Sequence, residues 1–331
     1  MFNEILFQDK HEKEIYNVFC QKVIVPIYSQ PWWLDAVCLP QNWNVHVIAE
    51  SGQYIAAMPY YVSERGGYKI ITKAHLTQTN GIIINYPNGQ KYCKRLDMDE
   101  RVINEMCSYI DELKVDKYEQ QFIPEFSNWL PFKWNGFNET TRFTYIIKNT
   151  SDMEVVRSQF SYQIRNKLKN AKKIVHLDET MNIDEFYSLI KESCERDGDE
   201  MSYSRQLLIR LYEACKEHEC CKILAAKDDE GRNHAAVLLV WDKTNVYYLI
   251  GGSNPELRSS QANAFLIEKG IELASSMGKV FDFEGSMIQG IERAFRAYGA
   301  EQVRYYRIYK AFNKDMPENQ VNHWSEAELL M

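Results

Sequence analysis

The clearest candidates for acid–base chemistry are two acidic residues in the C-terminal part of the chain. Asp282 and Glu284 alternate with Phe281 and Phe283, so both carboxylates would lie on one face of a β-strand. They stand at or beyond the carboxyl end of that strand, the edge where α/β sheets place their sites. Either carboxylate could accept a proton from a bound ligand. The structural alternative is that they cap the helix that follows.

An arginine follows these acids after one short helical segment. Arg296 comes directly after Phe295, near the end of a helix expected over residues 291–297. The dipole of that helix alone favours a cation at its C-terminus. A functional cation at this position would stabilise negative charge in a reaction, whereas a structural one would form a salt bridge to Glu284 or Asp282.

A glycine-rich strand exit precedes a long predicted helix. Gly251, Gly252 and Ser253 end a strand, and a helix is expected over residues 259–276. Backbone N–H groups at such a junction can bind an anion or a carbonyl oxygen. The alternative is an ordinary turn in which a serine caps the helix.

Several cations lie together on a helix predicted over residues 158–173. Arg165, Lys169 and Lys172 share one face of that helix beside an apolar stripe. No acidic residue occurs between residues 155 and 177, so these like charges repel one another without local compensation. An anionic ligand, such as a nucleotide diphosphate, a lipid diphosphate or tRNA, would explain this face. The alternative is a solvated surface.

Other sequence signatures of catalysis are missing. The chain has no nucleophile elbow, no zinc-protease motif and no dinucleotide-binding glycine pattern. Its seven histidines have no recurring spacing, and we interpret them as surface or packing residues. The group Cys215, His218, Cys220 and Cys221 lacks a second ligand pair at the right spacing, so we expect no metal site.

Length and composition favour two globular domains. A chain of 331 residues exceeds the usual size of one domain, and a 45% share of hydrophobic residues suffices for packed cores. A net charge of −7 argues against general DNA binding. No segment is long and apolar enough to span a membrane, and the N-terminus lacks the layout of a signal peptide. We therefore expect a cytoplasmic protein with no stable membrane insertion and no DNA partner.

The hydrophobic periodicity predicts an order of elements for each half of the chain. In the first half, helices are expected over 10–23, from residue 31 and over 101–113, with strands at 44–50, 54–62, 68–73 and 82–86. In the second half, strands are expected at 143–147, 174–177, 222–226, 235–241, 246–250, 280–283 and 302–309. Helices at 158–173, 183–196, 205–217, 259–276 and 291–297 lie between them.

These residues and this order of elements resemble FemAB-like proteins and their GNAT-superfamily relatives. The similar segments are Phe281–Met287, residues 295–303, Tyr162–Lys173, Pro31–Ala36 and Ala56–Tyr60. The resemblance covers roughly residues 29–310 and implies an α/β fold of mixed sheets with two tandem GNAT-like domains. Residues 1–140 would form the first domain, and residues 141–312 a second domain with the active site. Residues 313–331 would be a polar tail.

The resemblance implies an N-acyltransferase that moves an acyl or aminoacyl group to an amine by direct attack. The donor would be acyl-CoA or aminoacyl-tRNA, so tRNA is a candidate partner, and no cofactor would be bound permanently. The acceptor would be a small molecule or a peptidoglycan precursor, that is, a cell-wall or cell-surface precursor. The alternative is a non-catalytic GNAT-like module that binds a nucleotide or a cell-wall precursor.

The resemblance also assigns roles to the candidate residues. Fem-type relatives carry Phe-Lys where this chain has Phe295-Arg296, so Arg296 would stabilise the oxyanion together with backbone N–H groups near Gly251, Gly252 and Ser253. Glu284 or Asp282 would accept the amine proton. The phosphates of a substrate would be held by the cations of the basic helix, Arg165, Lys169 and Lys172.

Overall fold

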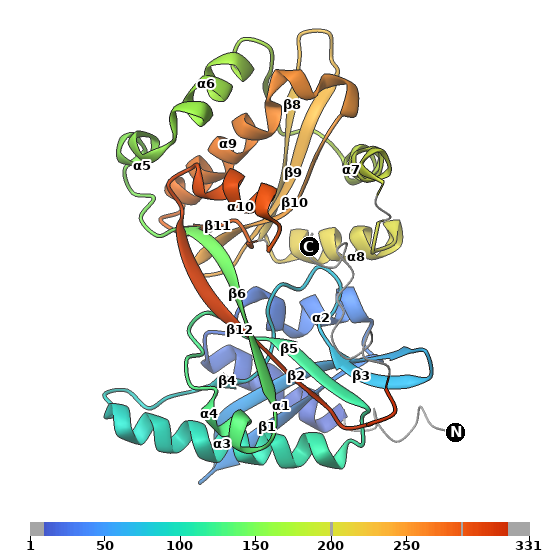
Figure 1. Ribbon diagram of the computed structural model, residues 1–331, viewed down its shortest axis with the longest axis vertical. Coiled ribbons are helices and arrows are strands. Elements are labelled where there is room, and N and C mark those ends of the chain that lie inside the picture. The colour runs from blue at the N-terminus through green and yellow to red at the C-terminus, as the bar shows by residue number, and fades with distance from the viewer. Residues whose placement is uncertain (1–9, 199–200, 286, 317–331) are drawn as a thin grey trace. The chain divides into compact units, whose positions relative to one another are not determined.

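A computed structural model describes residues 10–198, 201–285 and 287–316 of the chain (Figure 1). By their contacts, the described residues form two compact units. The first contains the described residues up to Arg142 and those from Arg304 on, and the second runs from Phe143 to Val303. Most of the tail expected at residues 313–331 lies outside the described residues. In the described ranges, no helix is long and apolar enough to cross a membrane.

The described strands form one 12-stranded mixed sheet, and the first unit contains one part of it with helices packed on it. Its strands follow the order β1 (Trp43–Glu50), β2 (Gln53–Arg65), β3 (Tyr68–Thr72), β5 (Lys117–Gln121) and β12 (Glu301–Ala311), and β4 (Ile83–Ile84) pairs with β2. Its helices are α1 (Lys10–Lys22), η1 (Ile27–Ser29), α2 (Pro31–Cys38), α3 (Tyr92–Glu112) and α4 (Leu130–Trp134). The periodic apolar positions predicted for α3, Val102, Met106 and Ile110, are all buried.

The second unit contains the rest of that sheet, with helices on both of its faces. Its strands follow the order β6 (Asn138–Ile147), β11 (Val280–Asp282), β10 (Asn245–Ser253), β9 (Asn233–Trp241), β8 (Cys221–Lys227) and β7 (His176–Asp178). Its helices are α5 (Met153–Gln159), α6 (Tyr162–Ala171), α7 (Ile183–Asp197), α8 (Arg205–Glu217), η2 (Pro255–Ser260), α9 (Ala262–Ser276) and α10 (Gln289–Arg296). Helices α6 and α9 cover one face of β8–β10, and α7 and α8 cover the other (Figure 1).

Helix α9 forms the centre of the second unit's core. Its side chains pack on β8 to β11, and α6 packs on α9 through an apolar stripe that includes Ile164 and Leu168. Gly270 allows this close approach, because a Cβ there would lie 2.9 Å from the ring of Phe281. Each large apolar side chain buried in this way stabilises the fold by about 1.5–3 kcal/mol. The core therefore holds α9 and its first turn in a fixed position against β10.

Strand β11 is short and pairs in parallel only with the start of β10. Their ladder runs from Asn245↔Val280 to Tyr247↔Asp282, and β10 carries a bulge after Tyr248. Beyond that point, β10 continues as the partner of β9, as far as the pair Ser253↔Ala235. The two strands thus separate, and the second half of β10 presents an edge that β11 does not cover.

Two long strands contribute residues to both units. β6 begins at Asn138 and passes through the boundary at Arg142. β12 begins in the second unit, is the neighbour of β6 in the strand order, and pairs with β5 from Arg307 to Ala311. Residues 304–312 thus group with the first unit, whereas the sequence analysis placed them in the second domain. The reason is the long ladder to β5, a strand that the apolar pattern did not reveal.

The predicted basic helix is two helices. α5 ends at Gln159 and α6 begins at Tyr162, with Phe160 buried between them and Ser161 as the cap of α6. The Ser161 hydroxyl accepts a hydrogen bond from the N–H of Ile164 at 3.3 Å, which satisfies one of the unpaired donors of the first helical turn.

Candidate active site

The second unit contains a cavity of about 820 Å³ where β10 and β11 separate. Its walls are the last residues of β10, the loop after β11, helix α10, the end of η2, the first turns of α9, and one side each of α6 and α7. A cavity of this size holds a small ligand or the reactive end of a large one.

The glycine-rich exit of β10, which the sequence predicts as a binding segment, lines the cavity. Gly251, Gly252 and Ser253 all border it. A Cβ on Gly251 would lie 1.8 Å from the hydroxyl oxygen of Tyr248, and one on Gly252 would lie 2.8 Å from a methyl group of Ile190. No larger residue fits at either position without displacing these neighbours. The glycines thus leave the backbone of β10 accessible where its ladder to β11 has ended.

Glu284 is the buried acid of the cavity. Its side chain lines the wall and is 7% exposed, and burial raises the pKa of its carboxyl well above the ordinary value. Its backbone has a φ of 62°, in the left-handed region that a residue with a Cβ adopts at a cost of order 1 kcal/mol or more. Strained, desolvated acids of this kind are frequent at functional sites. Glu284 therefore keeps its proton to a higher pH than an ordinary glutamate does.

Asp282 holds the loop that carries Glu284. It is buried but does not line the cavity. Its Oδ1 accepts hydrogen bonds from the Thr144 hydroxyl at 2.5 Å and from the Glu284 N–H at 2.8 Å. The two acids predicted on one strand face therefore have different positions, because the strand ends at Asp282 and the chain turns at Glu284. This arrangement fits Asp282 as a positioning residue.

Helix α10 brings Phe295 to the cavity and leaves Arg296 outside its lining. Phe295 is buried, and its ring centre lies 4.8 Å from that of Phe283. Arg296 is exposed, with its Nε 3.5 Å from Oε1 of Glu292 on the same helix. The arginine of this helix that lines the cavity is Arg293. The Phe-Arg match thus identified the correct helix but not the cation that borders the cavity.

The basic helix also presents a different face from the one expected. Gln163 and Lys167 of α6, one helical turn apart, line the cavity, whereas Arg165, Lys169 and Lys172 do not. The Arg165 guanidinium donates to the carbonyl oxygen of Phe160 at 2.6 Å, and Lys169 is exposed. A helical wheel shows which cations share a face, but not what packs beside that face.

Lys172 instead forms part of an ion network with α9. Its Nζ lies 2.5 Å from Oε2 of Glu268, which is 1% exposed, and the Arg157 guanidinium lies 2.8 Å from the other oxygen of Glu268. Burial would raise the pKa of Glu268, but hydrogen bonds and charge from Lys172 and Arg157 outweigh it and hold the pKa below the ordinary value. These two cations therefore stabilise a buried carboxylate of the fold.

The N-terminus of α9 provides an electropositive end to the cavity. Gln261, which precedes the helix, has a φ of 60° and makes no side-chain cap, and the residues from Gln261 to Ala264 line the cavity. The N–H groups of a first helical turn have no partner within the helix, and together with the helix dipole they favour an anion. Arg258 and Lys167 border the same cavity. The cavity thus has a buried acid in one wall and a helix N-terminus in another.

Sequence reasoning missed several residues of the lining. Tyr248, Arg293 and Lys167 border the cavity, and burial raises the pKa of the Tyr248 phenol to about 12. Tyr248 lies three residues before the glycines, in a run that looks like an ordinary strand. Only the bulge, which depends on the pairing of β10 with β9, brings its hydroxyl next to Gly251.

Comparison with known proteins agrees with this architecture. Residues 158–293 match the family model described as acetyltransferase (GNAT) domain, and this segment contains most of the cavity lining. No curated protein sequence matches the chain.

Solved structures with a similar fold include three informative ones. FemX is 14% identical with a TM-score of 0.67, and the match covers 93% of this chain and 97% of FemX. L-PGS from Bacillus licheniformis is 11% identical with a TM-score of 0.51, over 84% of this chain and 87% of that one. A tandem GNAT protein from the clavulanic acid biosynthesis pathway is 9% identical with a TM-score of 0.50, over 84% and 93%.

The chain has the tandem GNAT-like, FemAB-like fold that the resemblance implied, and residues 158–293 match the GNAT domain model. The α/β fold class expected from the sequence is confirmed.

Proposed function

We propose that the protein transfers an acyl group from a phosphate-bearing donor to a primary amine, inside the cavity of the second unit. The observation that carries this proposal is the separation of β10 from β11, which forms a cavity with the buried acid Glu284 in one wall and the N-terminus of α9 in another. A thioester donor with its phosphates at the helix N-terminus can lie along the uncovered edge of β10. Its carbonyl oxygen then meets backbone N–H groups near Gly251 and Gly252.

The reaction follows from these positions. The amine nitrogen attacks the carbonyl carbon, and backbone N–H groups of β10 stabilise the oxyanion. The amine proton passes to the Glu284 carboxylate, directly or through a water molecule. The bond from carbon to sulfur then breaks, and the leaving thiolate takes a proton from Tyr248, whose raised pKa keeps it protonated at neutral pH. The proton held by Glu284 returns to Tyr248 through solvent. Because the amine attacks the donor directly, no acyl-enzyme forms.

We propose acyl-CoA as the donor, because the matched domain is an acetyltransferase domain. Aminoacyl-tRNA is the second candidate, supported by the similarity to the fold of FemX. We propose that the acceptor amine belongs to a cell-wall or cell-surface precursor and that the reaction takes place in the cytoplasm. All eight cysteines are free thiols in the structure, which suits a reducing compartment.

Equilibrium binding of labelled donors tests this proposal. Purified protein is incubated with labelled acetyl-CoA and, separately, with charged tRNA, and bound label is measured. We expect acetyl-CoA to bind, and free CoA to displace it. Binding of charged tRNA alone would reassign the donor. Binding of acetyl-CoA without transfer to any amine would support a non-catalytic module, and binding of neither donor would contradict the proposal.

A further inference from the structure

A buried histidine borders the cavity and has no part in the mechanism above. His234 is the second residue of β9 and is 3% exposed. Its Nε2 lies 3.0 Å from Oδ2 of Asp228, while among the described residues its Nδ1 has no hydrogen-bond partner. A buried polar atom left unpaired destabilises the fold, so a ligand or an ordered water that pairs with it is bound more tightly.

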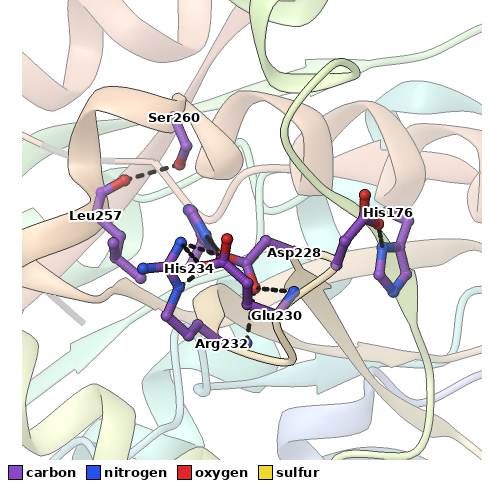
Figure 2. Close-up of polar contacts among 8 residues, drawn as sticks. His176, Asp228, Glu230, Arg232, His234, Leu257 and Ser260 are labelled. Atoms are coloured by element: carbon purple, nitrogen blue, oxygen red, sulfur yellow. Dashed lines mark hydrogen bonds and ion pairs between the residues drawn. The ribbon is translucent and has the colours of Figure 1, made fainter.

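Asp228 is held so that it can orient His234. Its Oδ1 accepts hydrogen bonds from the N–H groups of Glu230 at 3.1 Å and Arg232 at 2.8 Å, and the Arg232 guanidinium donates to its Oδ2 at 2.7 Å (Figure 2). The hydrogen bond from His234 is the largest cause of the low pKa of Asp228, which burial only partly opposes. An ionised Asp228 accepts a hydrogen bond from the protonated Nε2 of His234. The Nδ1 atom is therefore left to contact a ligand.

The position of His234 places it beside the anion-binding end of the cavity. Its carbonyl oxygen accepts the N–H of Asn254, the residue that precedes η2, and η2 contacts β9. Figure 2 shows His234 and Asp228 beside Leu257 and Ser260 of η2, whose end leads into α9. His234 and Ser260 line the same cavity.

Charged and titratable groups surround this end of the cavity. They are Asp228, Glu230 and Arg232 of the turn before β9, Arg258 of η2, and Cys194 and Arg196 of α7. Within the turn, Arg232 pairs with both acids. An anion at the N-terminus of α9 adds negative charge beside the imidazole, and this favours its doubly protonated form.

We propose that His234, oriented by Asp228, donates a hydrogen bond from Nδ1 to a phosphate oxygen of the donor, and that it takes up a proton when the donor binds. The inference rests on the proposed function, since it assumes a phosphate-bearing donor in this cavity. The Asp228 carboxylate balances the positive charge of a protonated His234. The imidazolium is therefore never an isolated buried cation, whether or not a phosphate is bound. His234 is thus a binding residue for the non-reacting end of the donor.

Calorimetric titration with CoA and with pantetheine, which lacks the phosphates, tests this contact. His234→Asn should weaken CoA binding about tenfold or more at pH 6.5, the range for a hydrogen bond to a charged group, and leave pantetheine binding unchanged. The affinity of the wild-type protein for CoA should fall as pH rises through the imidazole range, because binding favours the protonated form. His234→Asn should flatten that profile. Titrations in two buffers of different ionisation enthalpy should show fewer protons taken up by the variant.

His176→Asn is the matched control. His176 also pairs with an aspartate, Asp229, but its side chain is 55% exposed and does not line the cavity. Its replacement should change neither affinity nor proton uptake. Equal losses for CoA and pantetheine in His234→Asn, or an unchanged pH profile, would show that His234 only packs the fold and would overturn the inference.

A separate probe distinguishes this inference from the proposed function. If the wild-type protein binds neither CoA nor pantetheine, acyl-CoA as donor is wrong. Inorganic pyrophosphate then decides the inference. Binding that is lost in His234→Asn upholds it, and binding that is equal in both proteins, or absent from the wild type, overturns it.

Discussion

At the residue scale, the chemistry depends on which of several similar side chains borders the cavity. Glu284 and Asp282 are two residues apart, yet one lines the cavity and the other holds the loop through Thr144. The same contrast separates Arg293 from Arg296 on α10. The sequence identified the segments, because the glycines and the acids stand at strand ends. It could not identify the residue within each segment, because a positive φ at Glu284 and the end of the β10–β11 ladder are set by tertiary pairing.

Glu284→Gln should lower kcat by about 10²-fold or more, the usual contribution of a general base. The wild-type rate should rise with pH through the raised pKa of Glu284, and this limb should be absent from the variant. The measurement is kcat/KM against pH. The exposed Glu301, which pairs with Lys148 at 2.8 Å, offers the control Glu301→Gln, for which no change is expected. An unaltered pH profile in Glu284→Gln would exclude Glu284 as the base.

The same substitution should also alter stability in a pH-dependent way. A carboxyl whose folded pKa is raised favours folding below its unfolded pKa, and this contribution is lost as pH rises through the folded pKa. Glu284→Gln should therefore raise Tm relative to the wild type at pH 8 and have a smaller effect at pH 4. Thermal unfolding at the two pH values checks this. A loss of stability at pH 8 would mean that the ionised carboxylate is stabilised in the fold.

Arg293→Ala should raise the KM for the donor several-fold and leave Tm nearly unchanged, because this exposed arginine borders the cavity and a charge-assisted contact to a phosphate is lost. Arg296→Ala is the matched control on the same helix. Its exposed pair with Glu292 contributes well under about 1 kcal/mol, so its kinetic constants should be those of the wild type. Arg296 would instead be the oxyanion residue if Arg296→Ala greatly lowered kcat while Arg293→Ala changed only KM.

At the element scale, the positions of the site residues come from a few local features of strands and helices. The bulge after Tyr248 and the short ladder of β11 form the cavity, and the packing of α9 on the sheet fixes its helix N-terminus there. The periodicity of α7, α8 and α9 predicted these helices closely, since each has a regular apolar stripe. It failed for β5, a strand of mostly polar residues that is buried throughout. The Arg307 guanidinium donates a hydrogen bond of 2.8 Å to each carboxylate oxygen of Glu119 in β5. Arg307 is far away in the sequence, so no local pattern reveals this pairing.

Gly285→Ala tests the loop that carries Glu284. Gly285 has a φ of 68°, and a Cβ would lie 2.2 Å from the carbonyl oxygen of Phe143, so the loop must move. Gly278 has nearly the same φ, 64°, with nothing within 4 Å, so Gly278→Ala carries the conformational cost alone, about 1 kcal/mol. Denaturant unfolding and kcat should show a larger loss for Gly285→Ala in both quantities. Equal effects of the two substitutions would mean that the loop does not depend on this contact.

Glu268→Gln tests the structural role of the cations on α5 and α6. It should lower the unfolding free energy by about 2 kcal/mol at pH 7, less than for a fully buried pair because Arg157 and Lys172 are partly exposed. Because the folded pKa of the Glu268 carboxyl is lowered, the carboxylate stabilises the fold at pH values above its unfolded pKa. This stabilisation is lost as pH falls through the folded pKa. The difference from the wild type should therefore shrink at acidic pH. Lys172→Gln should likewise lower stability and leave the donor KM unchanged; a higher KM would return Lys172 to the binding site.

At the scale of the whole molecule, the FemAB-like resemblance predicted the fold class and the tandem organisation, and the fold comparisons confirm both. The exact limits of the units were harder to predict. β6 and β12 contribute residues to both units. Because strands join the units, no linker marks the boundary by a change in composition. The cavity, in contrast, is formed by residues of the second unit alone. We therefore propose that this cavity alone transfers an acyl group directly from donor to amine.

The fate of a labelled acyl group in a single turnover tests that claim most directly. Excess protein is mixed with labelled acetyl-CoA and lysine-bearing cell-wall peptides, the reaction is quenched at successive times, and label is measured on CoA, on the peptides and on the denatured protein. The account predicts that label moves from CoA to a peptide amine at a single rate and never appears on the protein. Label held covalently by the protein, or label that stays on bound CoA with every amine tested, would contradict it.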